Sequence, residues 1–130
     1  MRRTAAVLSF VLAGVAACAP VPTPTPDQPG YIVFFTPWSA DLDGPAQAVA
    51  ASAARAAQAA PGQPVYVEGY ADTVGSPESN FTLSKLRAQH LADILVQDGV
   101  AQSRIVLRPR GATPGDPAQE SRRVVIEIGR

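Results

Sequence analysis

The fold is decided by residues 65–99, whose sequence is VYVEGYADTVGSPESNFTLSKLRAQHLADILVQDG. At its start, valines alternate with other residues, which predicts a strand over 65–69 with the valine side chains facing inward. Farther on, leucines recur at helical spacing, which predicts a helix over about 80–98 that ends at Gly99. A polar loop that carries Asp72 joins the two, so the stretch supplies a strand, a loop and a helix in succession.

The segments on either side continue this alternation of strand and helix patterns. Residues 31–35 are bulky, β-branched or aromatic, and they predict a first strand. A helix is expected over 46–60, because Asp43 just before it is a suitable N-cap. Two further strands are expected at 105–108 and 123–128. The pattern therefore predicts an α/β arrangement in which helices pack on a sheet.

The charges of the chain balance, with eleven basic and eleven acidic residues. Removal of a leader that contains Arg2 and Arg3 leaves nine basic residues and a net charge of about −2, so no general attraction to nucleic acid is expected. Six of the nine fall in the last 27 positions: Arg104, Arg108, Arg110, Arg122, Arg123 and Arg130. They predict either a locally basic surface or strand arginines that pair with Glu68 or Glu127.

The N-terminus has the features of an export signal. Residues 1–17 begin with two arginines and continue with an apolar stretch at 5–15, which is shorter than the roughly 20 residues of a transmembrane helix. The sequence VAAC at residues 15–18 resembles the bacterial lipobox, whose cysteine is joined to a lipid and becomes the new N-terminus. We therefore expect lipidation at Cys18. The alternative is a plain secretory signal with a chance cysteine.

Residues 18–30 form a proline-rich segment between this signal and the folded part. Its alternating prolines favour an extended polyproline conformation that reaches on the order of 35 Å, although a spacer of no particular length remains an alternative. Ala19, and not an aspartate, follows the cysteine, which by resemblance to enterobacterial lipoproteins implies the outer membrane. One folded domain is expected over 31–130.

One charged residue interrupts the apolar face of the helix predicted over 80–98. The apolar side chains of that face are Leu83, Leu86, Leu91, Ile94 and Leu95. Arg87 points into this stripe, and a guanidinium that faces a core is costly unless it is paired. Asp72 in the preceding loop and Asn80 at the helix start are within its reach. An anion, a cation and an amide are therefore expected around the opening of one pocket.

Such a pocket suits a ligand that carries both an ammonium and a carboxylate. Asp72 is expected to accept hydrogen bonds from the ammonium, while Arg87 binds the carboxylate through two parallel hydrogen bonds. The alternative is architectural, because buried ion pairs often serve only to hold a fold together. In that case Asp72 and Arg87 bond to each other and join the loop to the helix.

Residues 71–88, ADTVGSPESNFTLSKLRA, resemble the signature of the OmpA C-terminal, Pal and MotB-type domains. The positions in register are Asp72, Gly75, Asn80, Leu83, Ser84, Arg87 and Ala88. The likeness extends over about 31–128. It implies a β-α-β-α-β-β fold, an α+β two-layer sandwich with the helices packed on one face of a mixed sheet.

In that family the domain binds peptidoglycan non-covalently, so the resemblance implies that Asp72 and Arg87 hold the diaminopimelate of the stem peptide. The further candidates for ligand binding are Thr73, Gly75, Asn80, Leu83 and Arg122. Two positions depart from the family pattern, since Ala71 stands where a threonine is usual and Ser121 where an asparagine is usual. A hydroxyl and an amide near the ligand are thus missing or changed.

Two functions of different classes remain open. The first is an anchor that joins the outer membrane to the cell wall. The second is an interaction subunit of an envelope complex, such as a Tol–Pal-like, secretion or motility assembly, in which wall binding is secondary. The sequence has no hydrolase or metal-binding motif, so neither enzymatic activity nor a cofactor is expected. Trp38, Phe34 and Phe35 are expected to be core and loop anchors, and His90 a partly buried packing residue.

Overall fold

The structure is a computed structural model that describes residues 30–114 and 118–129. The predicted export signal, the lipidated Cys18 and all of the proline-rich segment except Gly30 lie outside the described residues. Among the helices that are described, none combines the length and the apolar character that crossing a membrane requires.

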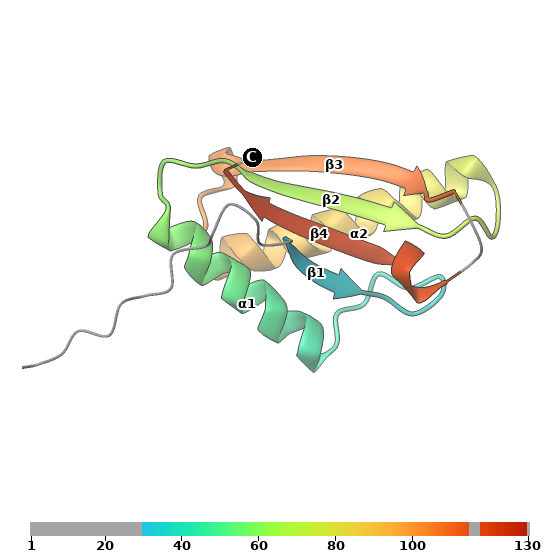
Figure 1. Ribbon diagram of the computed structural model, residues 1–130, viewed down its shortest axis with the longest axis horizontal. Coiled ribbons are helices and arrows are strands. Elements are labelled where there is room, and N and C mark those ends of the chain that lie inside the picture. The colour runs from blue at the N-terminus through green and yellow to red at the C-terminus, as the bar shows by residue number, and fades with distance from the viewer. Residues whose placement is uncertain (1–29, 115–117, 130) are drawn as a thin grey trace, which may run out of the picture.

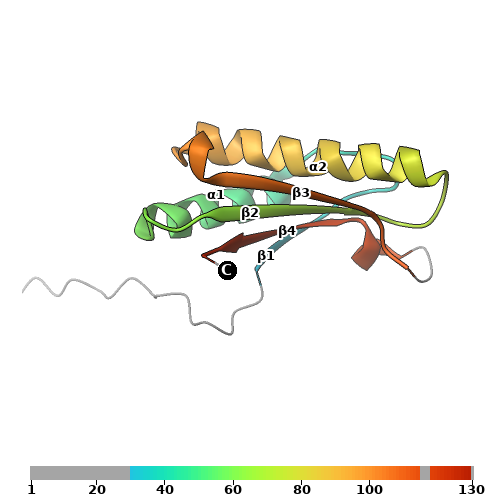
Figure 2. The same ribbon diagram turned by 90° about the horizontal axis from the view of Figure 1, so that it is seen from above.

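The described chain forms the β-α-β-α-β-β order predicted from the resemblance. The elements are β1 (Tyr31–Phe34), α1 (Gly44–Ala59), β2 (Val65–Ala71), α2 (Pro77–Gln97), β3 (Ile105–Ala112) and β4 (Arg123–Ile128), with short 3-10 turns at Gln102–Arg104 and Gln119–Ser121. The strand order in the sheet is β1-β4-β2-β3, in which β3 runs parallel to β2 and β4 antiparallel to both neighbours. Both helices cover the same face of this mixed sheet (Figure 2), so the predicted two-layer α+β fold is confirmed.

Helix α2 begins earlier than the sequence pattern indicates. Its N-cap is Ser76, whose hydroxyl accepts a hydrogen bond from the Ser79 amide at 3.1 Å, and Pro77 occupies the first turn, where a missing N–H costs nothing. The leucine spacing located the middle of the helix but not this cap. The N-cap predicted for α1 is confirmed, because the Asp43 carboxylate accepts from the Ala46 amide at 2.8 Å.

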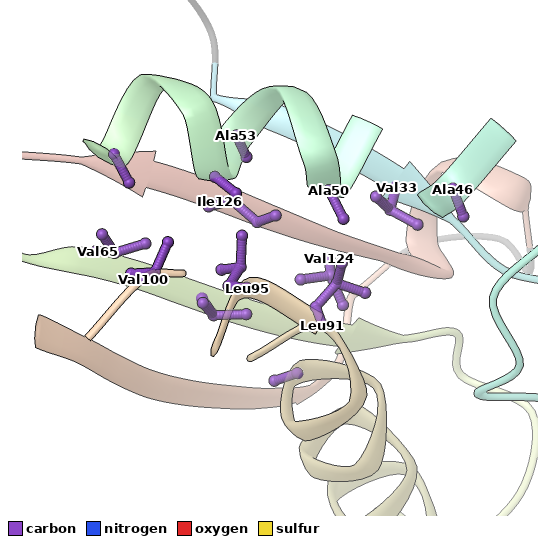
Figure 3. Packing of buried hydrophobic residues seen from close by; sticks show 14 of the residues in the cluster. Val33, Ala46, Ala50, Ala53, Val65, Leu91, Leu95, Val100, Val124 and Ile126 are labelled. Carbon is purple, nitrogen blue, oxygen red and sulfur yellow. The ribbon is translucent and has the colours of Figure 1, made fainter. Parts of the chain in front are cut away.

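The core lies between the helices and the covered face of the sheet. Val65 and Val67 are fully buried, as their alternation predicts. Helix α1 contributes only small side chains, and Figure 3 shows Ala50 and Ala53 opposite Ile126 of β4. Because alanines leave little distance between a helix and a sheet, α1 packs closely and leaves room for the larger leucines of α2.

The predicted apolar stripe of α2 is wrong at Leu86, which is 47% exposed. At about 100° per residue, Leu86 lies nearly opposite the buried Leu95, so the two cannot share a face. Helix α2 approaches β2 very closely at Gly69, where a Cβ atom would collide with the Ser84 carbonyl. This close approach brings the first half of α2 over the end of β2, where Asp72 follows.

Candidate functional site

The ends of β1 and β2 and the start of β4 lie at the same end of the sheet (Figure 1). Segments that are distant in sequence therefore meet there. Residues 36–41 follow β1, Asp72 follows β2, and Arg122 directly precedes β4. The first half of α2 passes over the same end and contributes Arg87. The fold thus brings together one carboxylate and two guanidinium groups.

Arg87 is completely buried, and each of its three nitrogens donates to a backbone carbonyl. Its Nε lies 2.8 Å from the Ser39 oxygen, its Nη1 3.0 Å from the Tyr70 oxygen and its Nη2 3.1 Å from the Thr36 oxygen. A buried guanidinium has to be satisfied in this way, because it loses its hydration without being able to shed its charge. Arg87 therefore ties α2 to the end of β2 and to the segment after β1.

Burial lowers the pKa of Arg87 to about 10, while the nearby Asp72 raises it and Arg122 lowers it. The group therefore stays protonated near neutral pH. Its guanidinium carbon also lies 5.1 Å from the centre of the Phe35 ring, whose negative face favours a cation. Arg87 thus places a full positive charge inside the domain, close to both Asp72 and Arg122.

Asp72 is nearly buried and uses both carboxylate oxygens. Oδ1 accepts from the Val74 amide at 3.0 Å, which closes a turn in the loop. Oδ2 forms an ion pair with Nη1 of Arg122 at 3.2 Å. Among the described residues, then, the ion-pair partner of Asp72 is Arg122 and not Arg87. The sequence-based alternative in which Asp72 and Arg87 bond directly to each other is wrong.

Arg122 is the more accessible of the two arginines. Its Nε donates to the Phe35 carbonyl at 3.2 Å, and its side chain keeps some contact with solvent. It lines a hollow of about 450 Å³ together with Thr36, Ser39 and Asp41. The carboxylates that line this hollow are those of Asp41 and Asp43, and Asp72 pairs with Arg122 outside its lining. The hollow therefore offers charges of both signs beside the Asp72–Arg122 pair.

Asn80 is buried in the first turn of α2, and its Oδ1 has no hydrogen-bond partner among the residues that the structure describes. A buried amide oxygen without a partner is unusual in a native protein, which keeps Asn80 among the candidate site residues. Ser84, in contrast, is fully satisfied, since its hydroxyl donates to the Phe81 carbonyl and accepts from the Gly111 amide.

The remaining predicted site residues fall into two places. Thr73 and Gly75 lie in the exposed loop after Asp72, and Gly75 has a φ of 100°, which a residue with a side chain rarely adopts. Leu83 lines a different hollow of about 370 Å³ on the outer side of α2. At the two positions that depart from the family pattern, Ala71 is fully buried and Ser121 nearly so.

Several features of this end differ from the expectations drawn from the sequence or carry no sequence signal. The carbonyl groups of residues 36 and 39 hold Arg87, but every residue has a carbonyl, so no sequence signal marks them. Trp38 is not a core residue, because it is 58% exposed, but its ring lies against Gly75 as expected of a loop anchor. The prediction that His90 is partly buried is wrong, because His90 is exposed; its Nδ1 lies 2.8 Å from the Ala40 oxygen. Only Phe35, of the three aromatic residues in this region, is a core residue.

Known proteins share both the sequence pattern and the fold. The OmpA family profile matches residues 34–124. The structure is similar to that of the peptidoglycan-associated lipoprotein from Burkholderia pseudomallei, with a TM-score of 0.70 and 21% sequence identity, over 75% of this chain and 89% of that chain. The C-terminal domain of Helicobacter pylori MotB gives a TM-score of 0.65 at 23% identity, over 79% of this chain and 84% of that chain.

The OmpA-like domain of FopA1 from Francisella tularensis subsp. tularensis SCHU S4 is also similar, with a TM-score of 0.66 at 22% identity, over 76% of this chain and 74% of that chain. No curated protein matches the sequence. At these low identities, the similarity to the solved structures shows only a common fold. The match to the OmpA family profile, in contrast, is a match of sequence.

Proposed function

This chain belongs to the OmpA family, and on this premise we propose that it binds peptidoglycan non-covalently through the diaminopimelate of the stem peptide. The observation that carries the proposal is the cluster of Asp72, Arg122 and Arg87 at one end of the sheet. The free end of diaminopimelate carries an ammonium and a carboxylate, which are complementary to an aspartate beside an arginine.

Asp72 and Arg122 meet the ligand first, because they keep a small exposed fraction, 12% and 16% of their side chains, whereas Arg87 has none. The ligand ammonium binds the Asp72 carboxylate, and the ligand carboxylate replaces that aspartate as a partner of Arg122, whose side chain is already in contact with solvent. Arg87 lies behind them, and its buried charge adds a positive potential that favours the carboxylate. For Arg87 to bind the carboxylate directly, the segment after β1 has to move, because that segment now occupies its nitrogens.

The other candidates contribute to binding in different ways. Asn80 has a buried amide oxygen that can accept an N–H group of the stem peptide only if the start of α2 shifts to expose it. Thr73 and Gly75 shape the loop that carries Asp72, and Leu83 offers an apolar contact in the separate hollow beside Trp38. The binding requires no bond to be made or broken, so we propose a binding protein and not an enzyme.

The proposed location follows from the N-terminal residues. With a lipid on Cys18, residues 18–30 act as a tether between the outer membrane and the domain on its periplasmic face. Replacement of Cys18 by serine is then expected to move the protein from the membrane fraction to the soluble periplasm. Continued membrane association of Cys18→Ser would contradict the anchor.

Sedimentation with purified sacculi tests the binding site. The mature wild-type protein is expected to pellet with diaminopimelate-containing sacculi, while Asp72→Asn and Arg122→Gln remain in the supernatant. Glu68→Gln is a matched control, because it also removes a carboxylate that pairs with arginines but lies on the open face of the sheet. Undiminished pelleting of Asp72→Asn and Arg122→Gln would refute the site. It would instead favour the role of an interaction subunit in an envelope complex.

A further inference from the structure

Trp38, the only tryptophan of the chain, has an unusual backbone conformation and an exposed side chain. Its φ is 58°, and in the described ranges no other residue except glycine has a positive φ. A bulky residue in this left-handed region is strained, and such strain persists only where neighbouring groups hold the backbone. An aromatic side chain buried in the core would explain the strain by packing, but the Trp38 side chain is 58% exposed.

The turn that carries Trp38 is held by α2. Arg87 donates to the carbonyls of Thr36 and Ser39, which lie on either side of Trp38, and His90 contacts the carbonyl of Ala40. These contacts fix the backbone on both sides of the ring without covering the ring itself. The result is an aromatic surface that is rigidly placed and open to solvent, which is the arrangement that lowers the entropic cost of binding a ligand.

The Trp38 ring also touches the loop that carries Asp72. A Cβ atom on Gly75 would lie 2.6 Å from Cη2 of Trp38, so only a glycine allows this contact without a shift of the ring. The aromatic surface therefore adjoins the loop of the proposed stem-peptide site. A ligand held by Asp72 can extend onto the ring without leaving the protein surface.

A shallow hollow of about 370 Å³ surrounds one side of the ring. Its apolar part consists of Trp38, Leu83 and the exposed Leu86. Its polar part, on α2, consists of Glu78, Ser79 and Thr82. An apolar floor with a few polar groups at one side is typical of a small-ligand subsite, and it is too small to be a stable protein interface.

We propose that this hollow binds an N-acetylated hexopyranose of the glycan strand, with the sugar ring stacked on Trp38. The C–H face of a pyranose is apolar and packs on the negative face of an indole, while its hydroxyls reach the hydroxyl and carboxylate groups of α2. The proposal rests on the proposed function, since the stem peptide is covalently joined to the glycan and brings a sugar to the neighbouring hollow. Asp72 would then bind the stem peptide of peptidoglycan, and Trp38 would bind its glycan strand.

The single tryptophan makes the test direct. We compare a diaminopimelate-containing stem peptide, the same peptide on its disaccharide, and a peptide-free disaccharide of the same sugars, by calorimetry and by fluorescence of the mature protein. The disaccharide-linked peptide is expected to bind roughly five-fold or more tightly than the peptide alone and to shield Trp38 from acrylamide. The peptide-free disaccharide is expected to change the fluorescence at millimolar concentration.

Variants of Trp38 and of a second exposed aromatic residue distinguish a loss of sugar stacking from a general effect on the fold. Trp38→Ala is expected to abolish the affinity gain from the sugar and to leave the affinity for the peptide unchanged, whereas Trp38→Phe retains part of the gain. Phe81→Ala is the matched control, because it removes another exposed aromatic side chain of this end that lines a separate hollow. Its affinity gain should equal that of the wild type.

The possible failures are distinguishable. Equal affinity for the two peptides, or a gain that survives in Trp38→Ala, would overturn the sugar subsite and leave the stem-peptide site intact. A wild-type protein that binds neither peptide would refute the proposed function. In that case the peptide-free disaccharide still decides the subsite, because an unchanged Trp38 emission would overturn it as well.

Discussion

Strand β2 and the loop after it carry two carboxylates whose surroundings differ sharply. Glu68 lies on the open face of the sheet, where its Oε1 accepts from Arg108 at 3.1 Å and from Arg110 at 2.9 Å, and Tyr70 donates to its Oε2 at 2.8 Å. The two arginines are 37% and 49% exposed. This confirms the sequence-based alternative in which strand arginines pair with Glu68. Asp72, in contrast, lies with Arg122 and the buried Arg87 at the end of the sheet where β2 ends and β4 begins, which we call the closed end.

The two carboxylates are about equally buried, at 14% and 12% exposure, so the difference between the clusters lies in the burial of their arginine partners. On the open face, Arg108 and Arg110 are exposed and can exchange their contacts with the partly buried Glu68 for water, so the ion pairs contribute little to stability. At the closed end, the buried Arg87 bonds the backbone of two other segments, so its loss removes the donors that join these segments to α2. The closed end therefore serves both the architecture and the proposed binding of a ligand.

Replacement of Arg87 by methionine tests this comparison with the largest expected effect. The variant keeps an apolar stem of similar length but removes the guanidinium donors to the Ser39 and Tyr70 carbonyls and one of two donors to the Thr36 carbonyl, so the free energy of unfolding should fall by about 3 kcal/mol. Urea denaturation measures the change as a lower midpoint. Lys85→Met is the matched control, since Lys85 is an exposed residue of the same helix and its loss should be nearly neutral. Equal stability of the two variants would contradict the architectural role of Arg87.

The fold could be predicted from the sequence because its signals are local. Alternating valines, an Asp43 cap and a glycine stop locate strands and helices within a few residues. The boundaries were less certain. The leucine spacing predicts that α2 starts near Asn80, whereas the helix begins at Pro77. Strand β3 extends past Pro109 because β3 is an edge strand that pairs with β2 alone, so not every backbone N–H group of β3 is needed for pairing.

The site was only partly predictable. The cost of a guanidinium on a core-facing helix surface correctly predicts that Arg87 is buried and compensated. Its actual partners are carbonyls, which carry no sequence signal. The pairing of Asp72 with Arg122 depends on the antiparallel approach of β4, and such long-range contacts follow from topology and not from spacing.

Replacement of Asp72 by asparagine has the second largest expected effect. The amide oxygen can still accept from the Val74 amide, so the turn is kept and only the charge is lost. Removal of the one carboxylate beside Arg122 and Arg87 should lower the free energy of unfolding by about 1–2 kcal/mol. Asp41→Asn is the control, because Asp41 is exposed at the same end. If Asp72→Asn has the same urea midpoint as the wild type, the stability of the cluster of Asp72, Arg122 and Arg87 does not depend on the negative charge of Asp72.

Replacement of Glu68 by glutamine has the smallest expected effect, below about 1 kcal/mol at neutral pH. The effect should also depend on pH. Burial raises the pKa of Glu68, but hydrogen bonds from Arg110, Tyr70 and Arg108 outweigh it and lower the pKa below its ordinary value of 4.5. The folded protein thus holds this proton less tightly than the unfolded chain.

The stabilisation from the Glu68 carboxylate is therefore fully present above about pH 4.5 and is lost as the pH falls through the lowered pKa of the folded state. Urea midpoints of the wild type and Glu68→Gln should differ slightly at pH 7 and converge toward pH 3. Glu120→Gln, which alters an exposed carboxylate elsewhere, should show no such convergence. If the difference in urea midpoint between the wild type and Glu68→Gln stays constant down to pH 3, the shape and hydrogen bonding of Glu68, and not its charge, hold the cluster on the open face together. The two clusters would then differ in their bonding partners, which are side chains around Glu68 and backbone carbonyls around Arg87.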